Sequence, residues 1–70
     1  MQKVRNFIFL VPDDTALGGM RMEVLSYPYA TQAEMMLLQE AFAKDAFAQQ
    51  FSHVVAATAQ LVMVRDTVEA

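Results

Sequence analysis

The stretch that decides the fold spans residues 31–53 and reads TQAEMMLLQEAFAKDAFAQQFSH. Thr31 and Glu34 form a capping box, in which each side chain can bond a free backbone N–H of the other residue. Strong helix formers follow, and Glu40 and Lys44 add a favourable i,i+4 pair. The stretch therefore predicts a helix over about 32–52 that ends near His53.

The large apolar residues of this predicted helix lie on two stripes, taking about 100° of rotation per residue. The first stripe consists of Met35, Leu38, Phe42 and Ala46. The second consists of Met36, Ala43, Phe47 and Phe51. A surface helix needs only one apolar stripe. Either both stripes form one broad buried face, or the first stripe contacts the sheet of the same chain and the second contacts a partner. We favour the second interpretation.

Three segments have the character of β-strands. Residues 3–11 contain the run FIFLV (7–11), which is apolar on both alternating faces, as expected for a strand covered on both sides. Pro12 ends this strand, because proline donates no ladder hydrogen bond. In the second strand, over 20–27, Arg21 and Glu23 alternate with apolar residues, so one face is exposed to solvent there. The third strand is predicted over 57–65, although the helix could instead continue to about Ala59.

The predicted element order is β-β-α-β, within a single α+β domain over residues 1–70. The third strand pairs either with the second, in parallel, or with the first, in antiparallel. We favour the largely antiparallel order 2-1-3, because it places the doubly apolar first strand in the centre. One helix covers one face of this sheet. The other face then carries either Phe7, Phe9 and Val11 or Ile8 and Leu10, and a second copy of the chain is the simplest cover.

The composition also favours association. A domain of 70 residues buries a small core and usually needs a disulfide, a metal or a partner for stability. The chain has no Cys and one His, which excludes disulfides and argues against structural zinc. Its hydrophobic content of 56% exceeds the usual range of about 45–50%. We therefore expect a homo-oligomer, with a dimer favoured and a heterologous protein partner as the alternative.

The charge pattern argues against a nucleic-acid partner. The chain is small and acidic, with a net charge of −3, and its five Lys and Arg residues are scattered, whereas nucleic-acid binding needs clustered cations. No apolar run approaches the roughly 20 residues of a membrane span. The apolar run after Arg5 stops at Pro12, short of a signal-peptide core. A cytoplasmic location is the default expectation, and the lack of Cys agrees with it.

The sequence carries no catalytic, cofactor-binding or metal-binding motif. His53 has no signalled nucleophile or acid beside it, so we expect a structural or surface role. Asp13 and Asp14 lack the spacing of a calcium loop and are typical of a turn. Gly18 and Gly19 match no phosphate-binding fingerprint. We therefore predict a protein that is not an enzyme and holds no cofactor or metal.

Three classes of function remain. The favoured class is a small non-enzymatic protein-interaction module that acts as an inhibitor or as a regulatory or accessory subunit. The alternatives are a structural assembly subunit and a small enzyme or small-molecule binder with a pocket between subunits. Tyr27 and Tyr29 flank Pro28, where they either pack in the core or anchor an interface. The predicted interface residues are Met36, Ala43, Phe47, Phe51, Phe7, Phe9, Tyr27 and Tyr29.

Overall fold

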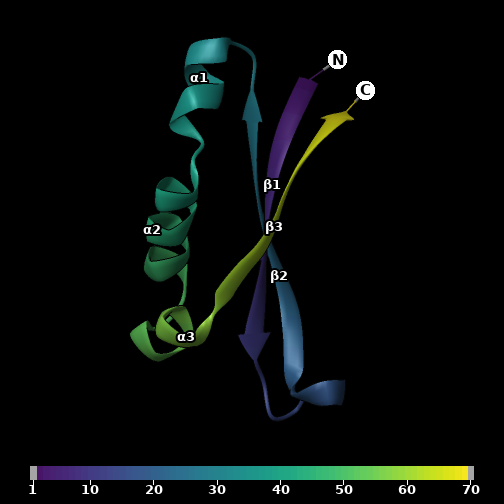
Figure 1. Ribbon diagram of the computed structural model, residues 1–70, viewed down its shortest axis with the longest axis vertical. Helices are drawn as coiled ribbons and strands as arrows, with labels where there is room; N and C mark the ends of the chain where they lie inside the picture. The colour runs from purple at the N-terminus through teal and green to yellow at the C-terminus, as the bar shows by residue number, and fades with distance from the viewer. Residues whose placement is uncertain (1, 70) are drawn as a thin grey trace.

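The computed structural model describes residues 2–69, apart from the side chains of His53 and Val54. Its strands are β1 (Gln2–Pro12), β2 (Met20–Tyr29) and β3 (Gln60–Glu69). Its helices are the short 3-10 helix η1 (Leu17–Gly19) and the α-helices α1 (Gln32–Leu37), α2 (Glu40–Gln50) and α3 (His53–Thr58). The three α-helices lie together on one side of the strands, and both ends of the described chain lie at the same end of the sheet (Figure 1).

The sheet has the order β2-β1-β3, and β1 pairs antiparallel with both neighbours. This confirms the predicted α+β fold with the order 2-1-3. At the middle of the sheet, Ile8 of β1 lies opposite Val24 of β2 and Met63 of β3. The register between β1 and β3 shifts next to Ile8, so that Phe9 pairs with Leu61 and Val62 is passed over. Such a bulge increases the local twist of the edge strand.

The two faces of the sheet are covered differently. Residues directly opposite one another in an antiparallel sheet share a face, so the odd-numbered residues of β1 from Arg5 to Val11 lie on one side and Ile8 and Leu10 lie on the other. The core is on the odd-numbered side, under the helices, and consists of Phe7, Phe9, Val11, Leu25, Tyr29, Leu38, Ala43 and Phe47. Of the two predicted possibilities, the helices therefore cover the phenylalanine face.

The continuous helix predicted over 32–52 is broken after α1. Leu38 leaves the helical conformation (φ −87°, ψ 72°), and Gln39 is extended. The Arg5 guanidinium from β1 donates to the carbonyl oxygens of Met35 (3.4 Å) and Leu38 (3.0 Å). Carbonyls at a helix end have no partner within the helix, so Arg5 provides the acceptors with a donor exactly where the chain turns inward to bury Leu38. The prediction of one helix was wrong because this donor lies 30 and 33 positions away from the two carbonyls in the sequence.

A second break separates α2 from α3. Phe51 is extended, and the Ser52 side chain accepts a hydrogen bond from the Val55 amide (3.3 Å), which makes Ser52 the N-cap of α3. Helical structure therefore continues to Thr58, in agreement with the alternative in which the helix extends to about Ala59. The third strand correspondingly begins at Gln60 rather than at residue 57.

The hairpin loop between β1 and β2 is held by its own hydrogen bonds. The Asp13 carboxylate accepts from the amide and hydroxyl of Thr15 (2.9 and 2.6 Å) and from Arg21 (3.3 Å). Hydrogen bonding to the charged form, led by the Thr15 hydroxyl, lowers the pKa of Asp13. Gly18 and Gly19 both have positive φ, 83° and 77°, which only glycine adopts without strain. The two aspartates and two glycines thus form a turn, as predicted.

Candidate functional site

The face of the sheet opposite the helices carries an uncovered group of apolar side chains. We call this group the open-face patch, and it consists of Ile8, Leu10, Met22, Val24 and Met63. The pairing register places all five on one side, in neighbouring positions of three strands. Met22, Val24 and Met63 are 63%, 49% and 52% exposed. No described segment of the chain lies over them, since the helices occupy the other side (Figure 1).

The first half of strand β2, residues 20–24, has its polar side toward the helices and its apolar side away from them, the reverse of what an isolated domain needs. Arg21 lies opposite Val11, and Glu23 lies opposite Phe9, so both charged residues share the side of the helices. They pair with each other at 2.9 Å and are only partly exposed. The face predicted to be wet is therefore the helix side of β2. The apolar residues that alternate with them, Met22 and Val24, lie on the side of the sheet opposite the helices.

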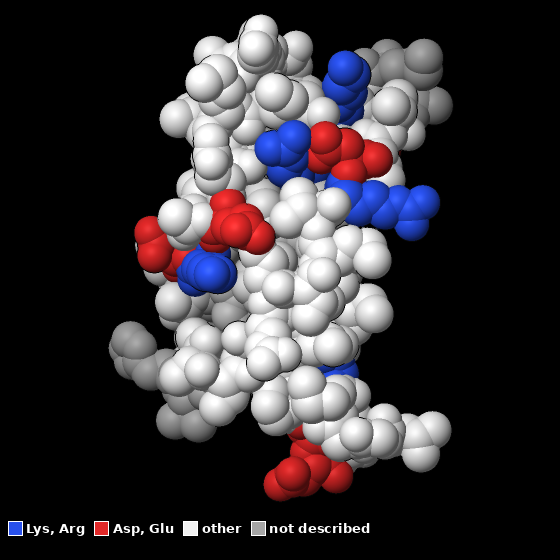
Figure 2. All heavy atoms as spheres, viewed as in Figure 1, with Lys and Arg blue, Asp and Glu red and all other residues white. Residues whose placement is uncertain are grey.

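The other half of the same face is polar. Asn6 accepts a hydrogen bond from the Ser26 hydroxyl (2.6 Å) and donates to the Thr67 hydroxyl (3.1 Å), which links the three strands across the face. Arg65 lies beside Asn6 in the register and is exposed. Figure 2 shows, on the side it presents, charged side chains over the helices, over the upper sheet and at the hairpin tip, with a broad uncharged area between them. The open-face patch is thus bounded by polar groups at one end of the sheet.

Most of the predicted interface residues contact the chain's own core instead. Phe7, Phe9, Ala43 and Phe47 are at most 2% exposed, and Tyr29 is also buried. Tyr27 and Phe51 are half-buried and pack against this core. Met36, at 59% exposed, is the one predicted interface residue with a free apolar side chain in the described part of the chain.

Both helix stripes contribute to the core. Leu38 of the first stripe is buried, and Met35 and Ala46 pack against the core beside it. The second stripe, through Ala43 and Phe47, packs on the sheet, and Phe47 contacts the rings of Phe9 (4.4 Å between centroids) and Phe51 (4.2 Å). Phe42 of the first stripe remains 40% exposed and only touches Tyr27 edge-on (5.1 Å). The two stripes thus form one broad buried face, the alternative to a second stripe that is free for a partner, and Met36 and Phe42 lie exposed at its margins.

A half-buried ion pair ties the helix layer to the sheet. Besides its two carbonyl contacts, Arg5 donates to both carboxylate oxygens of Asp66 (2.8 and 3.0 Å), and the Tyr29 hydroxyl donates to the same carboxylate (3.3 Å). The hydrogen bond from Arg5 is the main cause that lowers the pKa of Asp66, and it raises that of Arg5. Arg5, Asp66 and Tyr29 thus bond one another and the backbone carbonyls at the end of α1. We therefore assign the cluster to stability rather than to chemistry.

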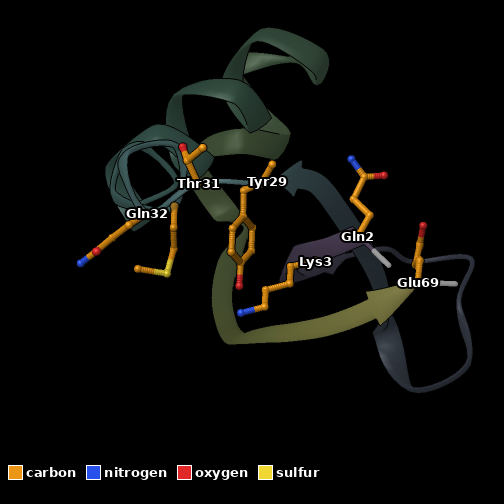
Figure 3. Close-up of a pocket in the computed structure, with 8 residues that line it drawn as sticks. Gln2, Lys3, Tyr29, Thr31, Gln32 and Glu69 are labelled. Atoms are coloured by element: carbon orange, nitrogen blue, oxygen red, sulfur yellow. The ribbon is translucent and has the colours of Figure 1, made fainter.

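A shallow hollow of about 740 Å³ lies where the strand ends meet α1. Lys3 and Tyr29 point into it, while Gln2 and Glu69 border it from the strand ends (Figure 3). No buried side-chain polar atom of the described residues lacks a hydrogen-bond partner, there or elsewhere. Among the described residues, no orphaned buried polar atom in the hollow therefore points to a ligand.

Within residues 2–69, leaving out the undescribed His53 side chain, no three His, Cys, Asp or Glu residues are placed to hold a metal ion. None of the described helices is long and apolar enough to cross a membrane. The predicted role of His53 lies outside the described residues. No protein-family model matches the chain, and no curated protein or solved structure shows significant similarity to it.

Sequence reasoning did not single out the open-face patch as the interaction surface. It named Ile8 and Leu10 only as one of two possible faces. The signal that could have found the patch is the alternation in β2, where Met22 and Val24 fall on the side opposite Arg21 and Glu23.

Proposed function

We propose that this chain is a small non-enzymatic protein-interaction module, an inhibitor or a regulatory or accessory subunit, whose docking surface is the open-face patch. The observation that carries the proposal is the reversed alternation of β2, which points Met22 and Val24 away from the helices. Contiguous exposed apolar patches of this kind are typical of interaction sites.

The arrangement of the charged groups supports the non-enzymatic part of the proposal. Arg5 pairs with Asp66, and Arg21 pairs with Asp13 and Glu23. These groups are engaged in holding the helices and the hairpin in place. A catalytic site instead brings a nucleophile, a base and an electrophilic group together around a pocket.

Site-specific photo-cross-linking tests the proposal. A photoreactive amino acid replaces Val24 in the open-face patch, and a matched control carries it at Leu37, an apolar residue of α1 that is 72% exposed. Both variants are irradiated in an extract of the source organism and as purified protein. We expect a discrete protein adduct from position 24 and none of equal yield from position 37. Equal or absent labelling at both positions would refute the docking surface.

A further inference from the structure

We infer that the partner of the open-face patch is a second copy of this chain, packed sheet against sheet around a two-fold axis. This inference rests on the proposed function and names the occupant of the same surface. In such a dimer each copy supplies one helix layer outside and one sheet inside. The polar Asn6, Ser26 and Thr67 half of the face lies toward the rim.

The exposed surface of the chain is too large for a compact monomer. The accessible area is 5048 Å² for 7.8 kDa. A compact monomeric protein of this mass exposes about 4,400 Å². The excess of roughly 700 Å² is close to the ~800 Å² that each partner contributes to an interface of standard size. One interface of ordinary dimensions would therefore account for the excess.

The shape of the chain leads to the same conclusion. The radius of gyration is 13.2 Å, and the Cα trace measures 39 × 23 × 16 Å. A compact domain of 70 residues has a radius of gyration of about 11 Å, and one of 140 residues about 14 Å. The chain is therefore a long, thin slab. A second sheet stacked at the usual spacing of about 10 Å would widen it in the direction in which the helices lie beside the strands, across the view of Figure 1.

The chemistry of the patch selects a copy of itself over an electrostatically chosen partner. A two-fold axis brings each patch against an identical patch, so a patch with charges of a single sign would be repelled by its copy. The five residues of the open-face patch are all uncharged, although the chain as a whole carries −3. The charged residues that the register places on this face, Arg65 and Glu69, lie opposite Asn6 and Gln2 at the polar end. Met22 and Met63 have flexible side chains that adapt to an identical opposing surface.

Sedimentation equilibrium of the purified chain is the first test. We expect a dimer mass at micromolar concentrations. Val24→Lys places a charge in the patch, and we expect it to weaken association by roughly tenfold or more, which is about 1.4 kcal/mol. The control Leu37→Lys adds the same charge on α1 and is expected to dimerise like the wild type. Circular dichroism verifies that both variants are folded.

Cysteine cross-linking provides a second test that keeps the patch nearly unchanged. The chain has no cysteine, so Val24→Cys and Met63→Cys each introduce a single thiol in the patch. We expect a bis-maleimide cross-linker to capture dimers of these variants, and to capture far fewer with Leu37→Cys.

Three results would overturn the inference. One is a wild-type chain that stays monomeric at high micromolar concentration. Another is a dimer that Val24→Lys leaves unchanged. The third is a dimer that Val64→Lys disrupts and Val24→Lys does not. Val64 lies on the helix side of edge strand β3, so this result would mean that the copies join through the edges of their sheets. A monomer that still gives a position-24 adduct in extract would refute the second copy but keep the proposed function. No adduct there would refute both.

Discussion

Replacing Phe47 by alanine measures which stripe of α2 supports the fold. Phe47 is 2% exposed, and its ring contacts those of Phe9 and Phe51. Burying such a side chain contributes about 1.5–3 kcal/mol, and each aromatic pair adds about 0.5–1.5 kcal/mol. These values agree with the ~3–5 kcal/mol usually lost on truncating a buried phenylalanine. A domain of 70 residues has only about 4–10 kcal/mol of stability, so Phe47→Ala should lose a large part of it.

The matched control is Phe42→Ala, in the same helix. Phe42 is 40% exposed and has one edge-on contact with Tyr27, so we expect a loss of about 1–2 kcal/mol. Urea unfolding followed by circular dichroism compares the two variants, at one protein concentration because self-association would shift the midpoint. At an m-value of about 1 kcal/mol/M, the midpoint of Phe47→Ala should fall several molar below the wild type. An equal or larger loss for Phe42→Ala would show that the first stripe faces the core and would refute the packing described above.

Three further predictions concern the ion pair, the hairpin and the first helix. The folded-state pKa of Asp66 lies below its ordinary value of 3.8, so the ion pair stabilises the fold fully above pH 3.8 and this contribution is lost as the pH falls through the lowered pKa. The unfolding free energy of Asp66→Asn should therefore decline less on acidification than that of the wild type. An equal decline in both proteins would contradict this. In Gly18→Ala the added Cβ meets no neighbouring atom, but an alanine must then adopt the backbone angle φ 83°. Urea unfolding should show a free energy of unfolding that is lower by about 1 kcal/mol. An unchanged free energy of unfolding would mean that the loop adopts another conformation. Thr31→Ala removes the side-chain cap that accepts a hydrogen bond from the Glu34 amide (3.1 Å), and the free energy of unfolding should fall by about 1 kcal/mol. Amide hydrogen exchange should become faster in α1 only. Faster exchange throughout the protein would argue against a local cap.

The sheet could be predicted from the sequence because its signals are local. The apolar run around Phe7–Val11 needs cover on both sides, which places β1 in the centre with antiparallel neighbours. Pro12 and the two glycines mark the hairpin turn, and Thr31 marks the start of the first helix. Each of these features depends on the conformational preferences of a few adjacent residues.

The candidate site depended on contacts between distant residues. Arg5 binds carbonyls at the end of α1 that lie 30 and 33 positions away in the sequence, and in α2 the structure buries Phe47 rather than Phe42. Periodicity gives the angles between residues on a helix or strand, but it leaves open which side faces the core. The sequence by itself determined that a sheet face and a helix stripe needed cover. Only the tertiary structure decided that the helices cover the phenylalanine face and leave Ile8, Leu10, Met22, Val24 and Met63 open, because that choice follows from the long-range packing of α2 and the anchoring of α1 by Arg5.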